Sequence, residues 1–137
     1  RKGLEGADAI VVAHEFRLLE APTTVLLGMN PLGDFGVIAL AGALRDTRVV
    51  TWLFLNTANV GPRGAMALAD ALRVNRSVTY LNLRDNHVGD RGAMAIADML
   101  RLNSTLKTLW LQRNSISEDG KRAVREAWGD RDGNPQL

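Results

Sequence analysis

The feature that constrains this chain most is a block of sequence that recurs every 28 residues. Its clearest copy, Val78 to Asn103, reads VTYLNLRDNHVGDRGAMAIADMLRLN. The alternation of Leu81 and Leu83 with polar residues predicts a half-buried strand. From Ala93 to Leu100 the apolar side chains follow the spacing of one helix face. Because so short a strand and helix cannot bury their apolar faces alone, the block predicts stacking on copies of itself.

The copies are present in four consecutive units without a gap. An asparagine, whose amide can satisfy backbone groups in a turn, follows three of the predicted strands, at Asn30, Asn86 and Asn114. The second unit has Ala58 instead, which leaves either Asn59 to substitute or a locally weaker turn. Apolar residues repeat in phase on the strands, at Val25, Leu27, Leu53, Leu55, Leu81, Leu83, Leu109 and Leu111, and on the helices, at Val37, Leu40, Ala41, Leu44, Ala65, Leu68, Ala69, Leu72, Ala93, Ile96, Ala97 and Leu100.

The pattern L-x-L-x-x-N-x-V-G-x-x-G-A-x-x-(L/I)-A-x-x-L, read from Leu81 to Leu100, resembles the 28-residue leucine-rich repeat of the ribonuclease-inhibitor type. The resemblance covers about residues 23 to 128. It implies an α/β fold, a curved solenoid with a short parallel inner sheet and outer helices. Similar repeats occur in Ran GTPase-activating proteins, in innate-immunity receptors and in tropomodulin.

The repeat phase predicts three parts of the chain. Residues 1–22 are a partial N-terminal repeat, helix only, because Ala9 and Phe16 fall in the helix columns. Residues 23–128 hold four repeats, and the last is expected to act as a cap because Lys121 and Arg122 replace small or apolar residues. Residues 129–137 are expected to leave the fold as a polar tail. The opening resembles the interior of a repeat array, so we favour a fragment of a larger protein.

Composition narrows the classes of protein to consider. The absence of cysteine fits a reducing compartment and favours an intracellular, cytoplasmic protein. Neither a charged-then-apolar leader nor an apolar run near 18 residues is visible, so the sequence predicts no membrane association. The net charge of +2 is too small to indicate a nucleic-acid partner by itself.

Aromatic residues gather at the outward strand positions, which the repeat does not dictate. Four of the seven aromatic residues lie there, beside polar and charged neighbours that resemble the rim of a protein interface. The predicted partner-binding residues are Trp52, Phe54, Asn56, Tyr80, Asn82, Arg84, Asp85, Trp110, Gln112 and Arg113.

Two packing explanations compete with a binding face. Aromatic residues favour strands and pair across them, so the rings would serve sheet stability alone. Alternatively, an upstream or neighbouring segment of a larger protein covers them. We favour the binding face because an exposed aromatic patch on a soluble protein usually has an occupant.

Several local motifs are explained by the repeat. Asp34-Phe35-Gly36 spells the kinase magnesium motif, but it lies in phase with three other predicted helix starts and lacks the accompanying kinase motifs. Two glycosylation sequons, starting at Asn75 and Asn103, fall at helix ends, where asparagine tolerates the left-handed backbone that ends many helices. His14 and His87 are expected to be solvated, without partners for a metal site. We predict neither an enzyme nor a cofactor or metal site.

The sequence therefore predicts a module that binds a protein or peptide through its concave strand face. Three alternatives remain. The resemblance to Ran GTPase-activating proteins implies a GTPase-activating or regulatory role, by fold analogy alone. The aromatic residues beside Arg84 and Arg113 would stack on nucleic-acid bases, which we regard as the weaker reading. The uncovered first strand, Thr23 to Leu27, would support a structural role in self-association.

Overall fold

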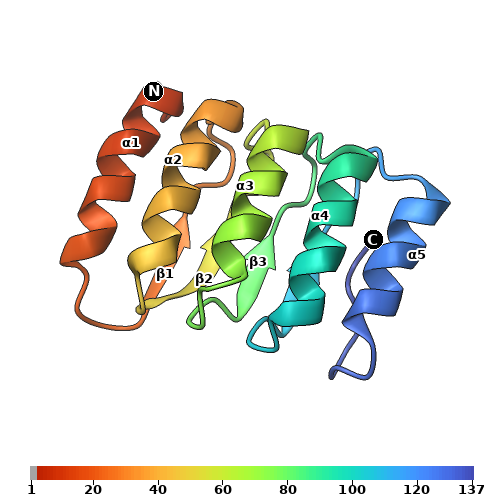
Figure 1. Cartoon of the computed structure of the whole chain (residues 1–137). Helices are drawn as coiled ribbons and strands as arrows, with labels where there is room; N and C mark the ends of the chain where they lie inside the picture. The colour runs from red at the N-terminus through yellow and green to blue at the C-terminus, as the bar shows by residue number, and fades with distance from the viewer. Residues whose placement is uncertain (1–2) are drawn as a thin grey trace.

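Helices and strands alternate along residues 3–137, the part of the chain that the computed structural model describes. The helices stand side by side in one layer, and the strands lie behind them in a second (Figure 1). This arrangement confirms the predicted α/β fold. The elements are α1 (Gly6–Glu15), the short 3-10 helix η1 (Phe16–Leu18), β1 (Thr23–Leu26), α2 (Gly33–Asp46), β2 (Val50–Phe54), α3 (Pro62–Leu72), β3 (Tyr80–Asn82), α4 (Gly89–Leu102), β4 (Thr108–Trp110) and α5 (Glu118–Trp128).

The strands form one parallel sheet in the order β1-β2-β3-β4. Its register places Leu53 beside Leu81 and Leu81 beside Leu109. Each helix packs on the next along the chain, so every strand-helix unit contacts mainly its neighbours. Equivalent residues of successive units therefore form rows across the molecule.

The core lies between the two layers. All of the apolar strand and helix positions that the sequence pattern selects from β1 to β4 and from α2 to α4 are buried. Burying one leucine side chain fully contributes about 2 kcal/mol, so the leucine rows are the main source of stability. Trp128 of α5 is 2% exposed and closes the core at the C-terminal end.

The helices approach one another closely because a glycine recurs near the start of each of α2 to α5. A Cβ atom added at Gly36 would lie 2.9 Å from the Cα atom of Gly6, and one at Gly92 would lie 2.9 Å from the Cβ atom of Ala65. The preceding helix leaves no room for a side chain at these two positions. At Gly64 and Gly120 an added Cβ atom would instead lie 2.7 Å from a carboxylate oxygen, that of Asp34 and that of Asp90.

The outward side of α1 has different chemistry at the equivalent positions. Asp8 stands where the later helices have glycine, and its carboxylate accepts a hydrogen bond from the backbone amide of Glu5 at 2.9 Å. Glu15 is exposed, whereas its equivalent in α2, Ala43, is buried. A helix packed on α1 as α1 packs on α2 would bury both carboxylates, which is costly without partners for them.

Buried asparagine amides join successive turns. The Nδ2 atom of Asn86 donates to three carbonyl oxygens, one of which, that of Leu55, belongs to the preceding unit. Its Oδ1 atom accepts from the backbone amides of Ala58 and Val60 at 3.0 and 2.9 Å. Asn114 repeats the three donor bonds one unit further on, and its Oδ1 atom accepts from the backbone amide of Val88. The amide serves as donor and acceptor at once, which explains why asparagine recurs at this position.

The turns of the first and second units are not joined by an asparagine side chain, because Ala58 has no side-chain amide. Among the hydrogen bonds of residues 3–137, the amide of Leu32 instead reaches the carbonyl oxygen of Asn30, at 2.7 Å. Asn59 is exposed and has a φ angle of 57°. The expectation that Asn59 substitutes is therefore wrong. The turn is joined to the first unit by backbone hydrogen bonds, such as that from the amide of Gly33 to the carbonyl oxygen of Ala58 at 3.1 Å, and a side-chain amide joins it only to the third unit, through Asn86.

A second row of asparagines joins the ends of the helices. Asn75 and Asn103 are each 1% exposed, and their Nδ2 atoms donate to the carbonyl oxygens of Leu44 and Leu72 at the end of the preceding helix. Asn103 has φ −109° and ψ 115°, so the left-handed conformation expected there is wrong. Both amides are buried and hydrogen-bonded, which leaves neither sequon accessible for glycosylation.

The last nine residues return to the sheet, so the expectation of a departing polar tail is wrong. Gln136 makes a parallel bridge to Trp110, with its amide donating to the carbonyl oxygen of Leu109 at 2.8 Å. The indole nitrogen of Trp128 donates to the carbonyl oxygen of Gly133. Apolar packing by Pro135 and Leu137 could not be read from so polar a segment.

Arg131 closes the row of helix-end amides. It lies 28 residues after Asn103, and its guanidinium donates to the carbonyl oxygens of Leu100 and Leu106. It also lies over the ring of Trp128, with 5.5 Å between the Cζ atom and the ring centroid. Partial burial lowers the pKa of Arg131 from its ordinary value. An arginine thus does at the C-terminal end what asparagine does between interior units.

Replacing Asn86 by alanine should lower the free energy of unfolding by about 2–4 kcal/mol, because buried backbone groups of two turns lose their partner. Urea denaturation followed by circular dichroism measures the change. Asn134→Ala is the matched control, since its side chain is exposed and its backbone is not left-handed, and should change stability by less than about 0.5 kcal/mol. Equal effects of the two substitutions would show that the Asn86 amide does not join the turns.

Deleting residues 133–137 should expose the edge of β4. The amide of Leu111, which donates to the carbonyl oxygen of Gln136, should then exchange its hydrogen faster, by about tenfold or more. The amide of Thr79, bonded to Thr51 inside the sheet, should keep its protection. Hydrogen exchange measured by NMR tests this, and unchanged exchange at Leu111 would contradict the strand-like role of the C-terminal segment.

Candidate functional site

The predicted binding residues lie on β2, β3 and β4 and in the turns that follow these strands. We call the surface formed by the outward residues of β1 to β4 and the turn residues after them the strand face. Its rows follow from the register, which pairs Trp52 with Tyr80, and Phe54 with Asn82 and then Trp110. The structure divides the ten predicted residues into an aromatic cluster, a charged group, a more buried pair near the C-terminal end, and two asparagines, Asn56 and Asn82, outside these groups.

The aromatic cluster consists of Trp52, Phe54 and Tyr80. The Trp52 and Tyr80 rings are stacked, with centroids 5.4 Å apart and an interplanar angle of 29°. The Phe54 centroid lies 4.8 Å from that of Tyr80 and 6.5 Å from that of Trp52. Trp52 remains 48% exposed, although it contacts both other rings. The cluster is therefore held in place by its own contacts and still offers a large apolar surface.

Sequence reasoning left two neighbouring side chains out of the site. Leu26, the Cα partner of Phe54 in the sheet, is 71% exposed, and Met29 in the following turn is 79% exposed. Leu26 extends the apolar surface of the aromatic cluster onto β1, and Met29 adds an exposed apolar side chain in the turn after this strand. Leu26 occupies an outward strand position, so alternation alone placed it on this face, but the choice of site residues followed aromatic and charged side chains.

The charged group consists of Arg84, Asp85 and Arg113. The Nε atom of Arg84 lies 3.1 Å from one carboxylate oxygen of Asp85, and the Nη1 atom of Arg113 lies 3.4 Å from the other. One carboxylate is thus shared by two guanidinium groups, and the group carries a net positive charge. These ion pairs are exposed and contribute little to stability, so their main effect is on the charge of the surface.

The backbone of the turns fixes the charged group. Met29, Thr57, Asp85 and Arg113 follow the strands and all have left-handed backbones, with φ angles of 62°, 54°, 56° and 56°. Such conformations cost about 1 kcal/mol or more in residues other than glycine and persist only where surrounding contacts impose them. The amide of Asp85, for example, donates to the carbonyl oxygen of Gln112 at 2.9 Å.

The remaining predicted residues do not join the aromatic cluster. Trp110 lies beside the C-terminal segment, and its indole nitrogen, like the Oε1 atom of Gln112, is buried without a hydrogen-bond partner in the described structure. Asn56 lies against Gly28, where an added Cβ would be 2.4 Å from its Oδ1 atom. Asn82 accepts a hydrogen bond from the backbone amide of Arg84. These four side chains lie outside the aromatic cluster and the charged group, and their role in binding remains a prediction.

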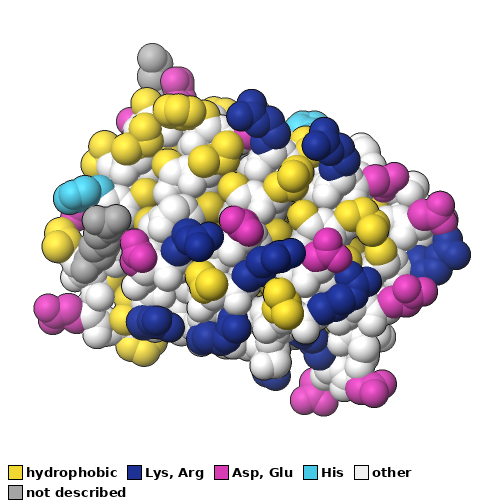
Figure 2. All heavy atoms as spheres, viewed as in Figure 1, with side chains coloured by type: hydrophobic (Ala, Val, Ile, Leu, Met, Phe, Trp, Pro, Cys, Tyr) yellow, Lys and Arg dark blue, Asp and Glu magenta, His cyan; other side chains and the backbone are white. Residues whose placement is uncertain are grey.

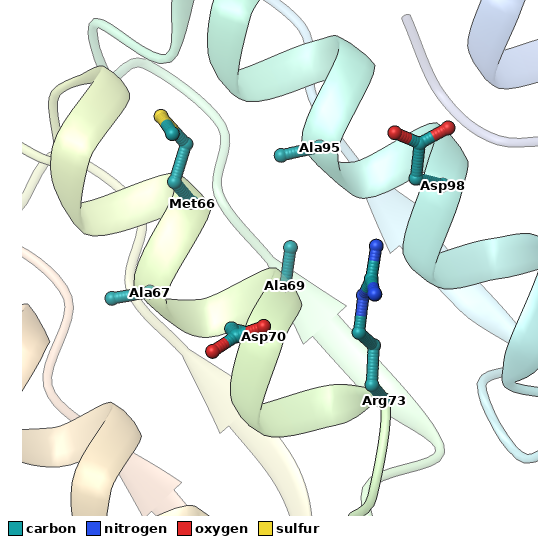
Figure 3. Close-up of a pocket in the computed structure, with 7 residues that line it drawn as sticks. All are labelled: Met66, Ala67, Ala69, Asp70, Arg73, Ala95 and Asp98. Carbon is teal, nitrogen blue, oxygen red and sulfur yellow. The ribbon is translucent and has the colours of Figure 1, made fainter.

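The opposite, helical face carries mixed charges over α3 to α5 and more apolar side chains toward α1 and α2 (Figure 2). A shallow groove runs between α3 and α4, lined by Met66, Ala67, Ala69, Asp70, Arg73, Ala95 and Asp98 (Figure 3). Similar grooves lie between α1 and α2 and between α4 and α5. Because small residues recur at these positions, we interpret the grooves as a result of the repeat.

The sequence motifs that suggested kinase or metal-binding chemistry are explained by the structure in simpler terms. The Oδ1 atom of Asp34 accepts from the amides of Gly61 and Gly64 at 2.7 and 2.9 Å, so it caps the start of α3. His14 and His87 are exposed. Within residues 3–137, no group of three or more histidine, cysteine or acidic side chains is placed to hold a metal ion. No helix in this part of the chain is long and apolar enough to cross a membrane.

Comparisons with known proteins agree with the fold. A leucine-rich-repeat family model matches residues 74–97, a segment that includes Tyr80, Arg84 and Asp85. No curated protein matches the sequence. The solved structure named Leiomodin-1 Actin-Binding Site 2 (ABS2) is similar, with a TM-score of 0.73 and 22% identity, covering 88% of this chain and 70% of that chain. Residues 74–97 are thus a leucine-rich repeat, and the chain shares the fold of a structure that contains an actin-binding site.

Trp52→Ala should lower the free energy of unfolding by only about 1 kcal/mol, because the side chain is half exposed and loses mainly its ring contacts. Trp110→Ala should cost about 2 kcal/mol or more, because it leaves a cavity between β4 and the C-terminal segment. Thermal denaturation of the two variants measures the difference. A larger loss for Trp52 than for Trp110 would support the view that the aromatic cluster serves only to stabilise the sheet.

Proposed function

We propose that this chain is an interaction module that binds a protein or peptide through its strand face. The observation that carries the proposal is the aromatic cluster, which remains exposed at Trp52 and continues onto Leu26 and Met29. Large apolar side chains with a polar rim are typical of the residues that dominate binding energy in protein interfaces. The leucine-rich-repeat match and the fold of the chain support an interaction role over an enzymatic one.

The rigidity of the strand face favours binding. Its rings pack on one another, and its turns are fixed by backbone hydrogen bonds and buried amides. A surface that is ordered before association loses little conformational entropy on binding, so a larger part of the contact energy appears as affinity.

The domain organisation belongs to the same proposal. We assign residues 1–22 to a partial N-terminal repeat and residues 23–128 to four repeats of the ribonuclease-inhibitor type, the last acting as a cap. The returning residues 129–137 complete this cap. We further propose an intracellular location, since the chain has no cysteine and resembles in fold a structure whose name describes an actin-binding site.

Actin is the first partner to test, because the similar solved structure is named for an actin-binding site. An affinity capture from a cell lysate, carried out in parallel with the actin-binding assay, would detect other protein partners. Both assays compare the native chain with a Leu26→Ala, Trp52→Ala double variant. We expect the double variant to lose about tenfold or more in affinity for the captured protein, as removal of central apolar contacts does.

The matched control is Phe35→Ala with Ile38→Ala, which removes exposed apolar side chains from the helical face. Binding that survives the strand-face changes and is lost in this control would contradict the proposal. GTPase activation and self-association through the outer edge of β1 remain predictions. Single-turnover GTP hydrolysis with candidate GTPases and sedimentation at several protein concentrations would test them.

A further inference from the structure

The strand face has an apolar half and a basic end. Leu26, Met29 and the aromatic cluster make up the apolar half, over β1, β2 and the start of β3. Arg84 and Arg113 make up the basic end, in and beside the turns after β3 and β4. A partner that covers this face must therefore present an apolar group to one half and a group that suits positive charge to the other.

The apolar half suits a large apolar side chain. Trp52 and Leu26 are 48% and 71% exposed, and they lie on adjacent strands whose register aligns Leu26 with Phe54. Covering these side chains would remove their apolar surface from water, at about 25 cal/mol for each Å². A leucine, phenylalanine or tryptophan side chain of a partner would make this contact.

The basic end suits a carboxylate. Arg84 and Arg113 share the single carboxylate of Asp85, and their side chains remain 44% and 72% exposed. Each guanidinium has five N–H donors, so both keep donors that Asp85 does not use. Among the outward residues of β1 to β4 and the turn residues directly after them, Asp85 is the only acidic one. The charge of this end is therefore complementary to an acidic group.

Along β3 and the residues that follow it, the strand geometry sets the distance from the aromatic cluster to the basic end. Tyr80 of the aromatic cluster and Arg84 are four residues apart along the same stretch of chain. At a rise of about 3.3 Å for each residue, this separation is about 13 Å, and an extended partner segment spans it with four residues of its own.

We infer that the strand face binds an extended segment of a protein partner in which a large apolar residue and an acidic residue are four positions apart. The apolar residue lies on the aromatic cluster, and the carboxylate lies between Arg84 and Arg113. The inference rests on the proposed function and specifies the chemistry of its partner.

The test selects binders from a random twelve-residue peptide library displayed on phage, with the native chain as the target. We expect enriched peptides to carry an apolar and an acidic residue at this spacing. An Arg84→Glu, Arg113→Glu variant should bind these peptides about tenfold more weakly and should select lysine or arginine at the acidic position. Affinity for the native chain should also fall as salt is raised.

A matched variant, Arg63→Glu with Arg91→Glu, makes the same charge change on exposed residues of α3 and α4 and should leave the peptide affinity unchanged. Thermal denaturation checks that each variant is folded. If the double change at Arg84 and Arg113 destabilises the chain, Arg113→Gln alone, at a side chain 72% exposed, takes its place with an expected loss of about threefold.

The outcomes separate this inference from the proposed function. Peptides that bind through Trp52 but show no acidic preference and no response to charge reversal would overturn the inference and leave the strand face as the binding surface. Peptides insensitive to both Trp52→Ala and charge reversal would overturn both. A library without enriched peptides would overturn the inference, while capture of a folded protein through Trp52 would still support the proposed function.

Discussion

The structure depends on the buried amide of an asparagine that faces two neighbouring units at once. Asn86 satisfies carbonyl groups of its own turn and of the preceding one, and it accepts hydrogen bonds from two amides of that preceding turn. No apolar residue of the same size satisfies both kinds of backbone group. Between the second and third units and between the third and fourth, the amide reinforces the register in which the leucine rows pack. The first and second units keep the same register through strand pairing without it.

The same register creates the strand face. Because equivalent residues of successive strands lie side by side, Trp52 meets Tyr80 and Leu26 meets Phe54, although these residues are far apart in sequence. The fold also brings the guanidiniums of Arg84 and Arg113 to the one carboxylate of Asp85. A property of the backbone, the constant advance from unit to unit, thus determines which side chains act together on the surface.

Periodicity was sufficient to predict the order of elements and the buried positions, since each depends on local alternation repeated in phase. The parallel sheet was implied by the resemblance to the leucine-rich repeat. Periodicity also placed Trp52, Phe54 and Tyr80 on one face. It did not predict that Trp110 is partly buried beside the C-terminal segment, because Gln136 and Pro135 lie outside the repeat and return through contacts that no periodic signal marks. Nor could periodicity show that Asn103 has an extended backbone. The side chain of Asn103 donates a hydrogen bond to the carbonyl oxygen of Leu72, which lies 31 residues earlier in the sequence.

Because of Ala58, the side-chain hydrogen bonds between successive units are unevenly distributed along the solenoid. In an array whose units contact mainly their neighbours, separation begins at the interface with the fewest bonds. The turns of the first and second units lack the asparagine amide that joins the later turns, whereas the C-terminal end is closed by Arg131 and Gln136. The first interface is therefore held by backbone hydrogen bonds, by the carboxylate of Asp34 and by apolar packing, without a bond from a buried asparagine amide. Leu26 and Met29 belong to the unit that is joined without this amide, so a local opening there would reduce the apolar half of the strand face while Trp52, Tyr80 and Arg84 stay in place.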